Sequence, residues 1–216
     1  MRNRFDRQLL ELNNELIQMG SLIEQAIEMG ISALVKQDVE KAEQAIKFDV
    51  EVDEQEKTIE SLCMKLLLQQ QPVAKDLRLI SAALKMITDM ERIGDQASDI
   101  AEIIETTDFS VPTNDVKLAK MAETTIAMVT ESIDAYVKQD LELVREVIAR
   151  DDEVDDLFLE VRQEIADDMV EAGDPMSSLD LLMIAKYFER IGDHATNIAE
   201  WVEFSITGTH KDADIL

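Results

Sequence analysis

One phrase of twelve residues occurs twice in this chain of 216 residues, and the repetition constrains the fold more than any other feature. The first copy, ERIGDQASDIAE, runs from Glu91 to Glu102, and the second, ERIGDHATNIAE, runs from Glu189 to Glu200. Nine of the twelve positions are identical, and the copies begin 98 residues apart (189 − 91). The chain therefore contains an internal duplication, and any fold assigned to it must be built twice.

The duplication extends well beyond this phrase. Residues 35–54 align without a gap with residues 137–156, at an offset of 102 (137 − 35), and ten of these twenty positions are identical. The offset falls from 102 to 98 before the second copy of the phrase, so about four residues are missing from a turn in the second half. Each half thus repeats one unit of roughly 105 residues.

The apolar residues of this chain recur at helical spacing. Near the N-terminus, Leu9, Leu12, Leu16 and Met19 follow one another at intervals of three and four residues. The same reasoning along the chain predicts six helices, at about 5–35, 39–70, 73–105, 115–137, 140–171 and 175–206. Asp38 is a suitable N-cap for the second helix, and we expect Pro72 in the first turn of the third. Only six Gly and three Pro argue against an all-β fold with its many turns.

We therefore predict an all-α protein made of two tandem, internally repeated three-helix bundles. Short connections make consecutive helices antiparallel neighbours, which favours a bundle of three in each half. The first bundle is assigned to residues 1–108, the second to 109–206, and a tail to 207–216. The stretch TTDFSVPTN, residues 106–114, is the best candidate for the linker between the halves.

The net charge of −26, from 47 acidic and 21 basic residues, limits the possible partners. Such a surface repels nucleic-acid phosphates and anionic lipid headgroups, so we expect neither nucleic-acid binding nor membrane insertion. Cations, or a protein with a basic surface, are the partners that it attracts. The polar N-terminus shows no export signal, which predicts a cytoplasmic protein. A single cysteine, Cys63, cannot form a disulfide within the chain.

Acidic residues form a narrow stripe on the repeated helix. On a helical wheel, the stripe in the first copy contains Glu91, Asp95, Asp99 and Glu102. The second copy repeats it with Glu189, Asp193, Asn197 and Glu200. Like charges four residues apart weaken a helix by a few tenths of a kcal/mol each. A stripe that is kept in both copies therefore suggests a compensating cation, although a solvated acidic face is the simpler alternative.

The preceding helix of each half adds a second pair of acids. Asp49 and Asp53 lie four residues apart, and so do their counterparts Asp151 and Asp155. If neighbouring helices are antiparallel, each pair can face the acidic stripe of its own half. Four carboxylates without a counter-ion would repel one another or take up protons, and a bound cation removes this conflict. Oxygen ligands suit Mg, Ca, Mn or ferric iron.

Three other duplicated or neighbouring positions qualify this prediction. Arg92 and Arg190 follow the glutamate in both copies, and we expect them to pair with nearby acids rather than to bind an anion. Gly94 and Gly192 lie next to the apolar side, where close helix packing explains them. His194 adjoins the acidic stripe, but the first copy has glutamine there, so the site does not require this histidine.

With both E-R-I-G-D-x-A-x-x-I-A-E phrases, the D-x-x-x-D pairs and the doubled three-helix plan in view, the chain resembles the PhoU family from residue 5 to about residue 204. The resemblance implies two similar three-helix bundles with metal ions, including iron or zinc clusters, on the acidic motifs. One site would use Asp49, Asp53, Glu91 and Asp95, with Asp99 possible. The other would use Asp151, Asp155, Glu189 and Asp193, with Asn197 possible. Asn197 departs from the acid of the first copy, so the two sites can differ in metal preference.

The resemblance also implies a role. Members of the family act as negative regulators of phosphate uptake and of the phosphate-starvation response. The expected partners are the ATPase of the phosphate transporter and the sensor histidine kinase, and a homodimer is expected by analogy. The sequence shows no nucleophile–base pair and no Gly-rich phosphate loop, so we do not expect an enzyme.

Two alternatives remain at the level of sequence. The first is a carboxylate-bridged metalloenzyme, such as a di-iron oxidase or a phosphohydrolase, although neither copy contains the Glu-x-x-His element of ferritin-like sites. The second is an acidic bundle that docks on a basic protein without any metal.

Overall fold

The computed structural model of the chain describes residues 2–70, 72–107, 116–172 and 175–209, and in these residues it is an all-helical protein. Six long helices follow one another: α1 (Arg2–Lys36), α2 (Val39–Gln70), α3 (Ala74–Thr106), α4 (Val116–Lys138), α5 (Leu141–Ala172) and α6 (Pro175–Thr207). The number of helices agrees with the prediction, and their bounds agree to within a few residues. The linker beyond Thr107, the predicted domain boundary at 108/109 and most of the predicted tail lie outside the described residues, so the domain limits stay a prediction.

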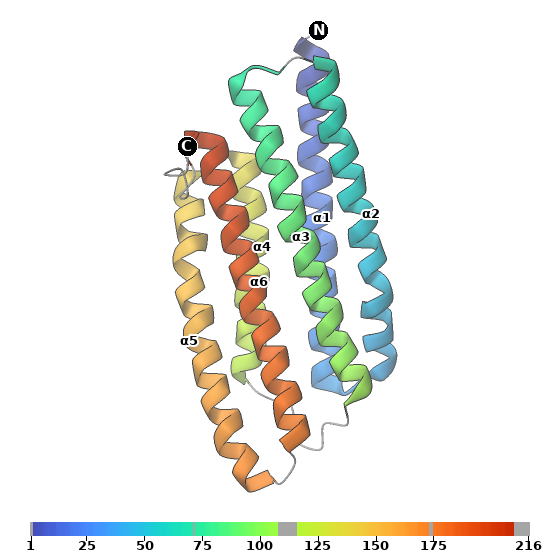
Figure 1. Cartoon of the computed structure of the whole chain (residues 1–216), viewed down its shortest axis with the longest axis vertical. Helices are drawn as coiled ribbons and strands as arrows, with labels where there is room; N and C mark the ends of the chain where they lie inside the picture. The colour runs from blue at the N-terminus through green and yellow to red at the C-terminus, as the bar shows by residue number, and fades with distance from the viewer. Residues whose placement is uncertain (1, 71, 108–115, 173–174, 210–216) are drawn as a thin grey trace.

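Consecutive helices are antiparallel, and each half forms a three-helix bundle, as predicted (Figure 1). Helices α1, α2 and α3 pack on one another in the first half, and α4, α5 and α6 do so in the second. The two bundles lie side by side, with α3 against α6 and α1 against α4. Helices α2 and α5 lie on opposite outer sides, each in contact only with helices of its own half among the described residues.

The two bundles share one hydrophobic core. Buried apolar side chains from all six helices form a single contiguous cluster, which includes Leu16, Val52, Met90, Met121, Val154 and Phe188. None of the described helices carries a stretch long and apolar enough to cross a lipid bilayer. The apolar stripes predicted from the spacing contribute their side chains to this core.

The first turn of each half is built in the same way. Gln37 and its counterpart Gln139 adopt left-handed backbone conformations, with φ of 50° and 55°, and each ends a helix. The next residue caps the following helix: the Asp38 carboxylate accepts a hydrogen bond from the Lys41 amide at 3.2 Å, as predicted. Asp140 does the same for the amides of Glu142 and Leu143, at 2.9 and 3.2 Å. These capped turns fix where α2 and α5 begin, and hence where their pairs of acidic residues lie along the bundle.

The prediction for Pro72 is wrong. Helix α3 begins at Ala74, and Val73 before it has an extended backbone with ψ of 166°. The first helical hydrogen bond runs from the Leu77 amide to the Val73 carbonyl at 2.9 Å. Because Val73 is extended, Pro72 stands outside the helix instead of in its first turn.

Candidate metal centre

Two glycines bring the acid-bearing helices close together. A Cβ atom added to Gly94 on α3 would lie 3.0 Å from Val52 Cγ1 and 3.2 Å from Asp49 Oδ1 on α2. At the equivalent Gly192 on α6, an added Cβ would lie 3.3 Å from Val154 Cγ1 on α5. The close helix packing expected from these glycines is confirmed. At Gly94 the missing side chain leaves room for a carboxylate oxygen between the helices.

The first half gathers its predicted acids between α2 and α3. Burial raises the pKa of Asp49 to about 6, and the charges of Asp95, Asp53 and Asp99 raise it further. The pKa of Glu91 is also raised, first by burial and then by Asp95, with a smaller contribution from Asp53. Asp49 Oδ1 on α2 lies 3.2 Å from the position of a Cβ atom on Gly94, the residue before Asp95 on α3, which agrees with these mutual effects. We call these acids the first acidic cluster: Asp49, Asp53, Glu91, Asp95 and Asp99.

The second half gathers the equivalent residues between α5 and α6. Burial raises the pKa of Asp151 to about 6, and the charges of Asp193 and Asp155 act in the same direction. The pKa values of Asp155 and Asp193 are raised as well, in both cases first by burial and then by Glu189. This second acidic cluster consists of Asp151, Asp155, Glu189 and Asp193.

Asn197, the fifth predicted residue of the second site, is shared between the two halves. It lines a pocket beside the second acidic cluster, but its Nδ2 donates a hydrogen bond to Asp89 Oδ1 on α3 at 3.2 Å. The same Asp89 oxygen lies 2.9 Å from His194 Nδ1. The structure therefore directs both side chains toward the first half, away from Asp151.

Two acids of this region were missed by the sequence analysis. Glu56 on α2 adjoins the first acidic cluster, because the pKa of Glu91 is raised in part by its charge. Asp89 on α3 faces α6. Their counterparts in the other half are Phe158 (56 + 102) and Tyr187 (89 + 98), so the comparison of the two copies could not single them out. Helical spacing alone would have found Glu56, which follows Asp53 by three residues.

Basic side chains already offset part of the acidic charge. Arg92 forms ion pairs with Asp95 at 3.1 Å and with Glu91 at 3.7 Å, which confirms the pairing with nearby acids expected for it. Lys186 pairs with Glu189 in the second half. A cation that bound to either cluster would compete with these partners for the same carboxylates.

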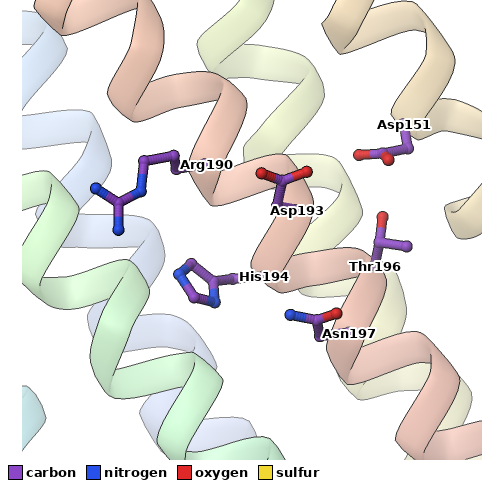
Figure 2. A pocket seen from close by; sticks show the side chains of 6 residues that line it. All are labelled: Asp151, Arg190, Asp193, His194, Thr196 and Asn197. Carbon is purple, nitrogen blue, oxygen red and sulfur yellow. The ribbon is translucent and has the colours of Figure 1, made fainter. Parts of the chain in front are cut away.

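A pocket of about 430 Å³ opens beside the second acidic cluster (Figure 2). Figure 2 shows Asp151 and Thr196 on one side of it, with Asp193 between them and the basic residues. The guanidinium of Arg190 extends in the opposite direction from Asp151. The pocket is lined by Asp151, Arg190, Asp193, His194, Thr196 and Asn197.

The donor atoms of both clusters are carboxylate oxygens, which suit hard cations such as Mg, Ca, Mn or ferric iron better than zinc. Half-burial, raised pKa values and the space at Gly94 all fit a bound cation. Within the described residues, however, no three side chains of His, Cys, Asp or Glu converge closely enough to hold one metal ion. The carboxylates would have to rotate toward a common centre and leave their lysine and arginine partners. The metal-ligand assignment therefore stays a prediction.

The chain is similar to known proteins along nearly its whole length. Residues 16–104 and 118–202 each match the family model described as the PhoU domain. A protein of Clostridium acetobutylicum, named phosphate-specific transport system accessory protein PhoU homolog, is 40% identical over 214 residues, covering 98% of each chain. A protein of the same name from Pseudomonas aeruginosa is 32% identical and covers 95% of this chain and 86% of that protein.

Solved structures agree with this result. The crystal structure of PhoU from Pseudomonas aeruginosa matches with a TM-score of 0.87 and 32% identity, over 95% of this chain and all of that one (100%). The phosphate transport system regulatory protein PhoU from Streptococcus pneumoniae matches with a TM-score of 0.88 over 96% of this chain and 99% of that chain, and at 24% identity it supports the fold alone. The matched proteins are transport accessory proteins and not enzymes. The doubled domain, the identity along nearly the whole length and the shared fold lead to one conclusion: the chain belongs to the PhoU family.

Proposed function

We propose that this protein is a cytoplasmic negative regulator of phosphate uptake and of the phosphate-starvation response. The names of its relatives, accessory proteins of a phosphate-specific transport system, support the link to phosphate transport. Its partners on this proposal are the transporter's ATPase and the phosphate sensor kinase, and it acts as a homodimer. A surface with net charge −26 suits docking on basic faces of such partners.

We further propose that regulation depends on cations bound at the two acidic clusters. The observation that carries this proposal is the equivalent burial of Asp49 and Asp151, whose pKa values are both raised to about 6. Holding these carboxylates half-buried among other acids costs stability, and a cation would remove that cost. The same costly arrangement occurs in both halves, which a purely structural role does not explain.

A cation titration tests this role. The purified full chain, stripped with chelator, is titrated with Mn²⁺ by calorimetry, and we expect two saturable sites per chain. The double substitution E91A/D95A should remove one site, and E189A/D193A should remove the other. Glu105, exposed at the end of α3, provides the control, since E105A should leave both sites intact. A titration without saturable binding would contradict the cation role.

The regulatory role needs a separate experiment. The protein is captured from cells grown at high and at low phosphate, and the co-purified proteins are identified. We expect the transporter ATPase and the sensor kinase in the eluate, more strongly at high phosphate. If neither partner is enriched over a mock capture at either concentration, the adaptor role is wrong.

A metal-free acidic adaptor is the second candidate. The ion pairs of Arg92 and Lys186 favour it, because they neutralise part of each cluster without any metal. Chelator separates the two candidates: partner binding that is weakened by salt but unaffected by chelator supports the metal-free adaptor. The enzyme alternative is set aside, because the family consists of accessory proteins.

A further inference from the structure

One part of this strongly acidic chain is depleted of acids. Residues 61–88, which run from the end of α2 into α3, contain one acid, Asp76, and four basic residues. The equivalent stretch of the second half, residues 163–186 (61 + 102 and 88 + 98), contains six acids and one lysine. The two halves share one fold, so this difference in charge reflects the surroundings of each hairpin and not the needs of the bundle.

The acid-poor stretch forms one end of the molecule. The connection between α2 and α3 lies beside the start of α1, beyond the last turn of α6 (Figure 1). The connection between α5 and α6 lies at the opposite end (Figure 1). Residues 2–7, in the first turns of α1, contribute three arginines and one aspartate to the same end as the α2–α3 connection. The molecule therefore has a basic end and an acidic end.

Apolar side chains are exposed at the basic end. Leu68 near the end of α2 is 79% exposed, Val73 before α3 is 64% exposed, and Leu77 in the first turn of α3 is 48% exposed. Leu68 lies sixteen residues beyond Val52 on α2, and Leu77 lies seventeen residues before Gly94 on α3, where these two helices touch. Leu68 and Leu77 are thus level on neighbouring antiparallel helices, and Val73 lies between them in the chain.

Two exposed lysines flank these apolar side chains. Lys65 precedes Leu68 by three residues, and Lys75 lies between Val73 and Leu77. We call this group the basic tip: Lys65, Leu68, Val73, Lys75 and Leu77.

The other two basic residues of the stretch face the second half instead. Arg78 Cδ lies 3.6 Å from the position of a Cβ atom on Gly208, just after α6. Lys85 Nζ lies 5.7 Å from the centroid of the Trp201 ring on α6. Lys65 and Lys75 are therefore the cations of this hairpin that an approaching surface meets first.

We propose that the basic tip docks on an anionic lipid surface. The apolar side chains enter the headgroup region, and the two lysines pair with lipid phosphates, as in other peripheral proteins that combine apolar and basic contacts. The contact is peripheral and involves no helix that crosses the bilayer. It depends neither on the cation role nor on the protein partners proposed above.

The net charge of −26 does not oppose this contact, because charges act over a short range in salt. The first acidic cluster lies around Gly94, seventeen residues from Leu77, which corresponds to about 25 Å along α3. At about 0.15 M salt the screening length is roughly 8 Å, so lipid phosphates at the tip are shielded from that cluster. The acids elsewhere repel the leaflet from the sides and from the opposite end, which makes the chain bind end-on.

The shape of the tip favours lipid over an acidic protein as the occupant. The exposed apolar side chains stand at the end of a projecting hairpin and not in a groove (Figure 1). A deformable lipid leaflet can surround such a tip and bury its apolar side chains.

Vesicle flotation of the full chain tests the proposal. Neutral vesicles of phosphatidylcholine are compared with vesicles that also contain about 30% phosphatidylglycerol, at about 0.05 and 0.15 M KCl. We expect binding to the anionic vesicles only, and weaker binding at the higher salt concentration. K65Q/K75Q should weaken it at least about tenfold, because each lysine near an anionic leaflet contributes about fivefold. L68S/V73S should weaken it at least about fivefold at both salt concentrations.

Two matched variants make the result specific. K36Q/K47Q removes two exposed lysines from α1 and α2 far from the tip. M176S/L179S removes two exposed apolar side chains from the equivalent hairpin of the second half. Both should bind anionic vesicles within about twofold of the unmodified chain, and circular dichroism confirms that all four variants are folded.

Three results would overturn the proposal. The first is the absence of binding to anionic vesicles, and the second is equal binding by K65Q/K75Q and the unmodified chain. The third is equal loss of binding in K36Q/K47Q, which would show that total charge matters and the tip does not.

Two further measurements identify the occupant if lipid is not bound. Retention of the unmodified chain on immobilised polyglutamate, lost in K65Q/K75Q, would assign the tip to an acidic protein. A dimer that becomes a monomer in L68S/V73S, by analytical ultracentrifugation, would assign it to a second copy of this chain.

Discussion

Asp49 shows at the scale of one residue why these carboxylates are sensitive to pH. Its pKa is raised from 3.8 to about 6 by burial and then by Asp95, Asp53 and Asp99, and Asp151 behaves alike. Between about pH 4 and pH 6 the folded chain holds protons on these residues that the unfolded chain has released. In cation-free protein their contribution to stability is therefore greatest at low pH and is lost as pH rises through this window.

We expect D49N/D151N to raise the free energy of unfolding more at pH 7 than at pH 4, because the amides carry no charge at either pH. Urea unfolding in the presence of chelator measures this difference. D6N, at an exposed position of α1, serves as a control for the loss of an acid elsewhere. An equal increase in the free energy of unfolding at both pH values would show that ionisation of the two carboxylates does not destabilise the folded chain.

The helical glycines give a second prediction at this scale. In G94A the new methyl group meets the buried, β-branched Val52 at 3.0 Å, whereas in G192A the nearest atom is 3.3 Å away. Alanine gains about 1 kcal/mol in helix propensity, but overpacking costs about 1–3 kcal/mol. We expect G94A to be destabilised by up to about 2 kcal/mol and G192A to be affected less. Chemical denaturation of both variants checks the order, and a more stable G94A would contradict it.

The duplicated acids could be predicted from the sequence because one half serves as a comparison for the other. Asp49 and Asp151 were selected in this way, because both copies have aspartate at this position although the residues beside it differ. The method fails where the halves have diverged: the counterpart of Asp89 in the repeat is Tyr187, and only the packing of α3 on α6 reveals the partners of Asp89. The orientation of the Asn197 side chain could not be predicted either, because it depends on a hydrogen bond to α3 of the other half.

At the scale of helices and turns, Gln37 has a backbone conformation that favours glycine. Its φ of 50° is left-handed, which costs a residue with a Cβ roughly 1 kcal/mol. We expect Q37G to raise the free energy of unfolding by about 0.5–1 kcal/mol. The control position, Gln44, is an exposed residue in the second turn of α2, and Q44G should lower the free energy of unfolding by about the same amount. Thermal or urea unfolding distinguishes the two signs, and destabilisation by both substitutions would contradict the argument.

The helices themselves were predictable because each is long and has a continuous apolar stripe. Asp38 was identified as a cap from its residue type and position, and the hydrogen bond to Lys41 confirms it. Pro72 was expected in the first turn of α3 but lies two residues before the helix begins, because residue type alone did not indicate that Val73 would be extended. Helix ends depend on local backbone conformation more than on the hydrophobic pattern.

At the scale of the whole molecule, the shared core predicts that both halves unfold together. Phe188 on α6 is 1% exposed, and its replacement by alanine should cost about 3–5 kcal/mol. The chain carries one probe in each half: Cys63 in the first, which is fully buried at 0% exposure, and Trp201 in the second. Cys63 reactivity toward a thiol reagent and Trp201 fluorescence should therefore give the same urea midpoint.

In F188A both midpoints should move down by the same amount. A Trp201 transition that shifts while the Cys63 transition stays in place would show two independent units. The sequence could not predict this cooperativity, because the pattern of apolar residues shows which side of a helix is buried but not which helix covers it. That α3 packs on α6 is evident only from the fold.

The antiparallel pairing of α3 with α6 has a consequence for how such a chain can arise. Because the repeat makes the two ends of this contact equivalent, one half alone would present a self-complementary face, like that of a two-fold symmetric dimer. When two copies are joined in tandem, each packing surface meets the other at a fixed, high effective concentration. After fusion the two copies can also diverge in sequence, so that a position with aspartate in one copy can have tyrosine in the other. A symmetric ancestor has no means of making such a distinction.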